Sequence, residues 1–367
     1  MSIAFAPDRW ETLRARYRTW WAGEAERPVL YIVGPRTPDR PPARFPHRGF
    51  LAQHGLDVEP ADIVDAADYV LAGQEYLVDA FPHLWLNYGA GVLAAFTGCE
   101  LRHDDNTVWF FPRRDVAARD LHLAFDAGNR WFRQLCDVAE VAAARWRGRV
   151  QVGTTDIGGA SDVVSSHLTA ERLLTDLYDA PEEIERLMWE AHTLWWHLWR
   201  EIDRRLRPCN PGYTCWTTIF SEEPYYMLQS DFCYMIGPAM FDRFVRPELV
   251  ASCRQLPNAF YHLDGIGELP HLDSLLAIPE LKGIQWVQGA GRGGPMEWLD
   301  VYRRILDGGK RLQVTGGSLS ESLAAIDILA GEGRNIGRIY LSSGLGAKDR
   351  AGRTDLEAFL KRYGGSL

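Results

Sequence analysis

The second half of the chain alternates short apolar runs with helical segments at a nearly constant pitch. The runs begin at Asn258, Gly283, Arg311 and Arg338, which are 25, 28 and 27 residues apart, and glycine-containing loops follow them. Alternation at this pitch predicts parallel strands joined by crossover helices. The helical segments expected between the strands are 269–277, 297–306 and 320–330.

Further apolar runs at Pro28, Arg149 and Tyr213 bring the candidate strands to seven. Eight strands would close a β/α barrel, whereas seven also suit an open doubly wound sheet. The sequence has neither GxGxxG after its first strand nor GxxxxGK[ST], so dinucleotide and P-loop folds lack support. A β/α barrel takes about 250 residues or more as one unit. We therefore predict an α/β fold, a single (β/α)8 TIM barrel over residues 1–367, with an N-terminal helical extension (1–27) and an inserted hairpin (100–112).

Charge and cysteine usage exclude several classes of protein. The chain has 40 Lys and Arg against 49 Asp and Glu, a net charge of −9, which disfavours a nucleic-acid partner. None of its six cysteines forms a CxxC pair, which argues against a zinc ribbon or thioredoxin-like centre. The N-terminus lacks the apolar region of a signal peptide, and the longest charge-free stretch, 81–99, contains a proline and three glycines. We expect no membrane partner and a cytoplasmic location.

In a β/α barrel the reactive groups lie at the carboxyl ends of the strands. His262 and Asp264 stand two residues apart at the end of the strand that begins at Asn258, so their side chains share one face. A histidine beside a carboxylate suits an acid/base pair or two ligands of a metal. The competing interpretation is that Asp264 caps the following turn and orients His262.

Other predicted strand ends supply further polar residues. We predict catalytic roles for Asp156 and Glu222 beside His262 and Asp264, against the plainer alternatives of a turn residue and a solvated acid. The chain also has 14 tryptophans. Trp195, Trp196 and Trp199 on the helix 181–206 are assigned to packing, whereas two on strands are expected to line the pocket and favour a flat or apolar ligand surface. The predicted substrate-binding residues are Tyr261, Trp216, Trp286, Gln288, Asp231 and Ser343.

Several motifs follow one another in a familiar order: DIGGASD at Asp156–Asp162, IGPAMF at Ile236–Phe241, YHLDG at Tyr261–Gly265 and IQWVQGAG at Ile284–Gly291. Together they resemble the uroporphyrinogen decarboxylase superfamily, which includes corrinoid-dependent methyltransferases that move methyl groups to thiols. The resemblance covers nearly the whole chain and implies a single (β/α)8 barrel with N-terminal additions.

The chain departs from both branches of this superfamily. The methyltransferases bind zinc through a His-x-Cys pair and a second cysteine after the last strand; here His262 matches, but Asp264 and Leu345 stand near the cysteine positions. The resemblance then implies a harder nitrogen/oxygen site built from His262, Asp264 and another carboxylate. The decarboxylases carry an arginine-rich stretch after the first strand, of which only Arg36 is kept. Their histidine in a GHG turn after the last strand falls near Ser343. Haem-pathway decarboxylation is not expected.

The sequence therefore predicts a barrel enzyme that acts on a small organic substrate by methyl (C1) transfer or C–X bond cleavage, with a possible divalent metal at His262 and Asp264. One alternative is a metal-independent decarboxylase or lyase in which Asp156 and His262 handle protons. Another is a catalytically silent barrel that binds a ligand or a partner protein. The resemblance also implies a homodimer and a corrinoid protein or folate as a partner.

Overall fold

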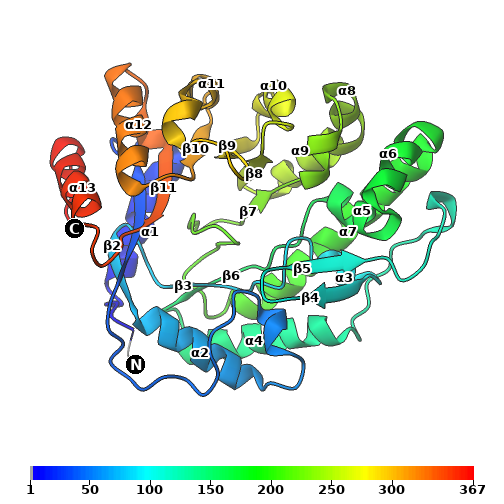
Figure 1. The fold of residues 1–367 in the computed structure, drawn as a ribbon, viewed down its shortest axis with the longest axis horizontal. Coiled ribbons are helices and arrows are strands. Elements are labelled where there is room, and N and C mark those ends of the chain that lie inside the picture. The colour runs from blue at the N-terminus through cyan, green and yellow to red at the C-terminus, as the bar shows by residue number, and fades with distance from the viewer. Residues whose placement is uncertain (1–2) are drawn as a thin grey trace.

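The computed structural model describes residues 3–367, with a seven-stranded sheet at its centre (Figure 1). The strand order is β2-β1-β11-β10-β9-β8-β7. All neighbours from β7 to β11 and on to β1 pair in parallel, and β2 pairs antiparallel with β1. The strands are β1 Val29–Pro35, β2 Gln74–Val78, β7 Tyr225–Leu228, β8 Asn258–Asp264, β9 Leu281–Val287, β10 Arg311–Val314 and β11 Ile339–Gly344.

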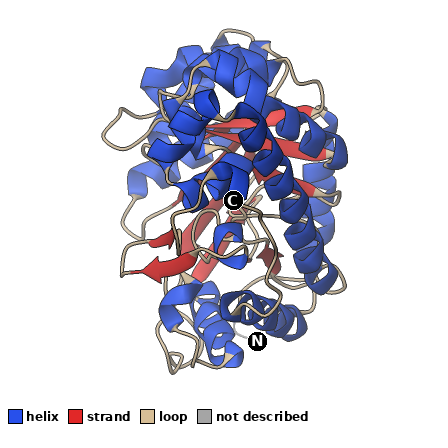
Figure 2. Cartoon of the chain, turned by 90° about the vertical axis from the view of Figure 1, so that its right-hand side faces the viewer, coloured by secondary structure: helices blue, strands red, loops and turns tan. Residues whose placement is uncertain are grey.

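Helices connect the consecutive parallel strands and cover their outer side, as Figures 1 and 2 show. This arrangement confirms the strand–helix alternation predicted for the second half of the chain. Such crossovers bury the outer face of the parallel strands. The connecting helices are α9 Arg246–Gln255, α10 Leu272–Leu276, α11 Leu299–Asp307 and α12 Leu319–Gly331, and α13 Arg350–Tyr363 follows β11.

Two further strands, β3 (His83–Trp85) and β6 (Gln151–Gly153), form a separate parallel pair. The mixed α/β architecture with its parallel central sheet is consistent with an α/β barrel. The described ladders belong to separate sheets, so closure of the barrel stays a prediction. The inserted hairpin is confirmed as β4 (Glu100–His103) and β5 (Val108–Phe111), whose turn is held by Asp104 Oδ1 accepting from two backbone N–H groups.

The first half of the chain adds helices that pack around these strands. Helix α7 has the predicted bounds, 181–206, and its tryptophans Trp195, Trp196 and Trp199 are buried as expected. Trp195, for example, lies edge-on to Tyr226 of β7, with ring centroids 4.8 Å apart. No helix among residues 3–367 is long and apolar enough to span a bilayer. The larger helices here are α1 Arg9–Ala22, α2 Pro60–Ala72, α4 Arg130–Trp146, α5 Ala160–Leu168, α6 Ala170–Asp179 and α7 Pro181–Leu206.

Helix α1, the predicted N-terminal extension, packs against one end of the parallel strands. Trp20 stacks on Phe260 near the start of β8, with centroids 6.0 Å apart. Tyr17 lies 6.4 Å from Tyr340 at the start of β11. These large buried rings fill the amino-terminal end of the strands. Much of the aromatic content therefore builds the core at the end opposite the carboxyl ends.

The prediction of a strand that begins at Tyr213 is wrong. Tyr213 and Ser221 form an isolated antiparallel bridge, and the next strand, β7, begins only at Tyr225. Residues 214–220 between them form a loop, which reverses the direction of the chain. Gly212 and Pro224 frame this turn: a Cβ at Gly212 would come within 2.4 Å of the Ser221 carbonyl oxygen, and proline has no N–H for a ladder.

Candidate functional site

The register of the sheet places a row of polar side chains on one face. His262 of β8 pairs with Gln285 of β9, Gln285 with Gln313 of β10, and Gln313 with Tyr340 of β11. Partner residues in parallel strands point to the same side, and side chains two apart share it, so Asp264 belongs to this face as well. The β8 end of this row, His262 and Asp264, lies at the carboxyl end of its strand, where a β/α fold carries its reactive groups.

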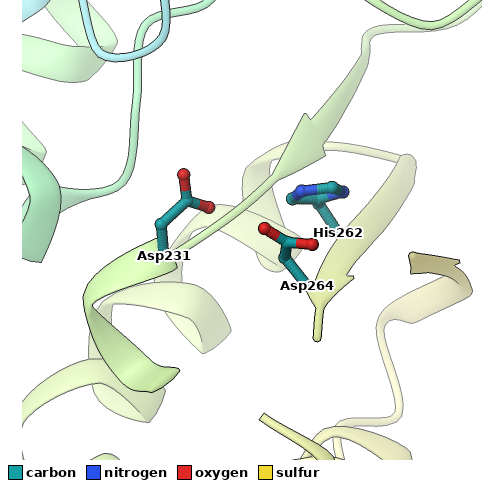
Figure 3. A group of neighbouring side chains, drawn as sticks. All are labelled: Asp231, His262 and Asp264. Carbon is teal, nitrogen blue, oxygen red and sulfur yellow. The ribbon is translucent and has the colours of Figure 1, made fainter. Parts of the chain in front are cut away.

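Asp231, His262 and Asp264 bring their ligand atoms within 4.8 Å of one another. Asp231 begins a short 3₁₀ helix (Asp231–Met235) that follows β7, whereas the other two residues end β8. Figure 3 shows both carboxylates directed into the space beside the imidazole ring. The sequence placed Asp231 among substrate-binding residues, and the structure brings it to the His262–Asp264 pair as a third donor.

The imidazole of His262 is held on both sides. Its Nδ1 lies 2.5 Å from Oε1 of Gln285, and the ring of Trp216 meets it edge-on with centroids 4.8 Å apart. Burial lowers the pKa of His262, with the Gln285 hydrogen bond and the charge of Asp264 acting the other way. With Nδ1–H donating to the amide oxygen, the neutral ring leaves the lone pair of Nε2 available to a ligand.

Asp156, predicted as catalytic, lies buried just beyond β6. Its Oδ1 accepts the backbone N–H groups of Gly158 (3.0 Å) and Gly91 (3.4 Å). Burial, and next the negative charge of Asp231, raise the pKa of Asp156 to about 7. This carboxyl can therefore carry a proton near neutral pH, a property required of a general acid.

Asp162, on α5, supports the position of Asp231 and was not predicted from the sequence. Its oxygens accept the backbone N–H groups of Gly159 (3.0 Å) and Phe232 (2.9 Å), so it holds the residue next to Asp231. Burial and the charge of Asp231 raise the pKa of Asp162 to about 7. A signal in the sequence could have indicated this role. Asp162 stands three residues after Gly159, the residue before the helix, and an acid at that position accepts the backbone N–H of the capping residue.

The surroundings of the three donors are acidic. Partial enclosure by the protein and the charge of Asp264 raise the pKa of Asp231 to about 6. Part of the Asp231 side chain remains accessible to solvent. Burial and the charge of Asp231 raise the pKa of Glu268 to about 10, and Tyr261 Oη donates to its Oε2 at 3.4 Å. The charges that shift these groups come from other carboxylates, so this region favours a cation.

Three predicted site residues lie away from this cluster. Glu222 precedes β7 instead of following a strand, and it pairs with Arg18 of α1 at 2.8 Å, at the amino-terminal end of the strands. Trp286 occupies the opposite face of β9, where its ring lies 5.2 Å from that of Trp298. Tyr261 likewise alternates with His262 and points to the other face of β8.

The remaining predicted residues lie at the same edge as Asp264. Gln288 follows β9 directly, and its Oε1 lies 3.5 Å from Thr315 Oγ1, beyond β10. Trp216 reaches His262, although from a loop and not from the predicted strand. On β11 the register puts Ser342, and not Ser343, on the face of Tyr340.

Comparisons with known proteins bear on the fold. No family model matches the sequence, and no curated protein matches it either. Among solved structures, the chain is similar to a methyltransferase from Methanosarcina mazei, with a TM-score of 0.58 and 12% identity over 96% of this chain and 98% of that one. The two proteins share a fold. The similarity spans nearly the full length of both chains and supports the methyltransferase-like architecture expected from the sequence; at this identity it carries the fold and not the chemistry.

Proposed function

We propose that this protein is an enzyme of the methyltransferase type that binds a divalent metal and acts on a small organic substrate by methyl (C1) transfer or C–X bond cleavage. The observation that carries the proposal is the convergence of Asp231, His262 and Asp264 within 4.8 Å at the carboxyl end of the sheet. The shared fold with a methyltransferase supports the reaction class by analogy.

The donor set is suited to a divalent cation. Two carboxylates and one neutral imidazole offer oxygen and nitrogen ligands, which suit Zn²⁺ and harder divalent ions better than a thiolate-selective metal. Asp231, His262 and Asp264 would hold the ion, and Gln285 would fix the ring of His262 behind it. When bound, such an ion supplies a Lewis acid that polarises a substrate atom or lowers the pKa of a bound nucleophile.

Asp156 is the proposed proton carrier of the site. Two backbone N–H groups occupy its Oδ1, which leaves Oδ2 for a substrate proton. Its pKa of about 7 places both protonation states within reach at neutral pH. The charge of Asp231 raises the pKa of Asp156, so the two carboxyl groups are close enough to interact electrostatically.

The charge of the site limits the substrate. Asp231 and Asp156 lie in a field set mainly by carboxylates. A polycarboxylate would be repelled there, whereas a neutral or cationic molecule would not. We therefore propose a small substrate without multiple carboxylates. A corrinoid protein as methyl donor, a homodimer and a cytoplasmic location are further proposals that accompany this reaction class.

Metal analysis of protein purified without chelator tests the proposal. We expect close to one divalent ion per chain in the wild type, and its loss in D231N and H262Q. D273N is the matched control, because Asp273 is an exposed acid paired with Arg304 on the surface. Methyl transfer from methylcobalamin to 2-mercaptoethanol, followed by the corrinoid absorbance, then tests the reaction class.

The outcomes separate the candidate functions. Metal binding that is unaffected by D231N and H262Q would refute the proposed site. Turnover that survives full removal of metal but is lost in D156N would favour the metal-independent decarboxylase or lyase. A chain that binds neither metal nor methyl donor, and whose site variants behave as wild type, would favour the catalytically silent barrel.

A further inference from the structure

The loop that precedes β7 lies against the face of the sheet that carries His262 and Tyr340. Its base is closed by the Tyr213–Ser221 bridge, in which each backbone N–H donates to the other residue's carbonyl at 2.7 and 3.0 Å. We call residues 214–220 the inner loop. Its last residue, Phe220, packs against Trp10 and Tyr17 of α1, with ring centroids 5.4 and 5.5 Å apart. The inner loop therefore rests on the aromatic core at the amino-terminal end.

The middle of the inner loop is tied to strands on either side of the site. Thr217 Oγ1 lies 2.8 Å from Tyr225 Oη at the start of β7. Thr218 Oγ1 lies 2.7 Å from Tyr340 Oη and 3.4 Å from Ser342 Oγ, both on β11. Strands β7 and β11 are four positions apart in the sheet, so the loop bridges across the face that carries His262.

Residues of the inner loop alternate in exposure. Cys215 and Thr217 are buried, whereas Trp216 and Thr218 remain partly accessible. Trp216 meets His262 edge-on, at 4.8 Å between centroids and 89° between planes, and Thr218 meets the side of β11. The accessible residues of the loop thus face the same space as the imidazole.

We propose that the inner loop is the floor of the site and that Trp216 is a positioning residue for His262. Gln285 fixes the Nδ1 edge of the ring, and Trp216 fixes the orientation of its plane; Thr218 anchors the loop that carries Trp216. This inference rests on the proposed function for its metal-binding consequence, but the positioning itself does not require a metal.

Co²⁺ binding tests the consequence, because its visible absorption reports the geometry of its ligands. In W216L we expect the dissociation constant for Co²⁺ to rise about tenfold and the absorption bands to shift, as removal of outer-shell support does elsewhere. W216F should restore most of the wild-type spectrum, and T218V should shift it in the direction of W216L by a smaller amount. W189L is the matched control, since Trp189 is an exposed tryptophan on α7. A W216L protein with wild-type affinity and spectrum would overturn the inference.

A second measurement on metal-free protein separates this inference from the proposed function. In NMR spectra of protein with labelled histidine, the ring signal of His262 is assigned by its loss in H262Q. We expect that signal to move in W216L, to move less in W216F, and to stay in place in W189L. A wild type that binds no Co²⁺ but shows this pattern would refute the metal site and support the positioning role. An unmoved signal in W216L would overturn the positioning role whatever the metal does.

Discussion

Nδ1 of His262 lies 2.5 Å from Oε1 of Gln285, the residue directly beside it on the neighbouring strand. The partner is an amide and not a carboxylate, so it fixes the tautomer without adding a negative charge next to the ring. Burial then keeps the pKa of His262 below its usual range. A neutral ring with a free Nε2 is the form that binds a metal, because a protonated imidazole has no lone pair to offer.

Replacement of Gln285 by leucine should weaken metal binding while the three donors remain. Loss of an outer-shell partner of a metal-binding histidine typically costs about 10–100-fold in affinity. Competition with a chromogenic Zn²⁺ chelator would measure the change. Q313L is the matched control: Gln313 pairs with Gln285 in the next strand but has no hydrogen bond at its buried Oε1. Equal affinity in Q285L and the wild type would contradict the outer-shell role.

The sequence predicted the His262–Asp264 pair because residues two positions apart on a strand share a face. It also predicted Asp231, but not that this residue joins the pair, because the distance between a β7 loop and the end of β8 depends on packing. The sequence could not show that Trp286 faces away from the site, since the register of parallel strands follows from the whole sheet. Ser342 was missed for the same reason, as a slip by one residue exchanges the two faces.

The pH dependence of stability should change when Asp156 is replaced by asparagine. The carboxyl of Asp156 has a pKa of about 7 in the folded protein and about 4 when unfolded. Between these values the folded state holds a proton that the unfolded state has lost. Stability therefore falls as pH rises from about 4 to about 7 and levels off above, by at most about 4 kcal/mol for this group.

D156N removes the ionisation and keeps an oxygen for the two glycine N–H groups. We expect its free energy of unfolding to exceed that of the wild type at pH 8 and to approach it at pH 5. Urea unfolding at the two pH values, with a chelator present, would measure this. The control D273N should have the wild-type pH dependence of stability. If the free energy of unfolding changes with pH equally in D156N and the wild type, the raised pKa of Asp156 is refuted.

Glu268 should tolerate replacement by glutamine. Its side chain is fully buried, and its pKa of about 10 means that the carboxyl is protonated at neutral pH. Glutamine has nearly the same shape and keeps the oxygen that accepts from Tyr261 Oη. We expect E268Q to change the free energy of unfolding at pH 7 by less than about 1 kcal/mol. A large loss of stability in thermal or urea unfolding would indicate that Glu268 is ionised and bound to a cation.

The fold was predictable where the chain repeats and not where it deviates. The strand–helix alternation from Asn258 onward predicted strands β8 to β11, because each strand with its helix is a local pattern that ends in a glycine-containing loop. The apolar run from Tyr213 has the same local pattern as a strand, yet its residues contact Tyr340 and Trp10, which lie more than a hundred positions away. Such tertiary contacts override strand propensity and leave no mark in a short window of sequence.

Asp79 provides a large expected effect on stability outside the site. Its carboxylate accepts both Nη groups of Arg27, at 2.7 and 2.9 Å, and the backbone N–H of Leu30 at 2.9 Å; the Asp79 side chain is only 6% exposed. D79N would leave the Arg27 guanidinium without its counter-charge, and loss of one partner of a buried pair costs about 3 kcal/mol or more. The control D300N breaks an ion pair in which the acid is 93% exposed, and such pairs contribute less than about 1 kcal/mol. Urea unfolding of the two variants should differ accordingly, and similar small losses in both would contradict the structural role assigned to Asp79.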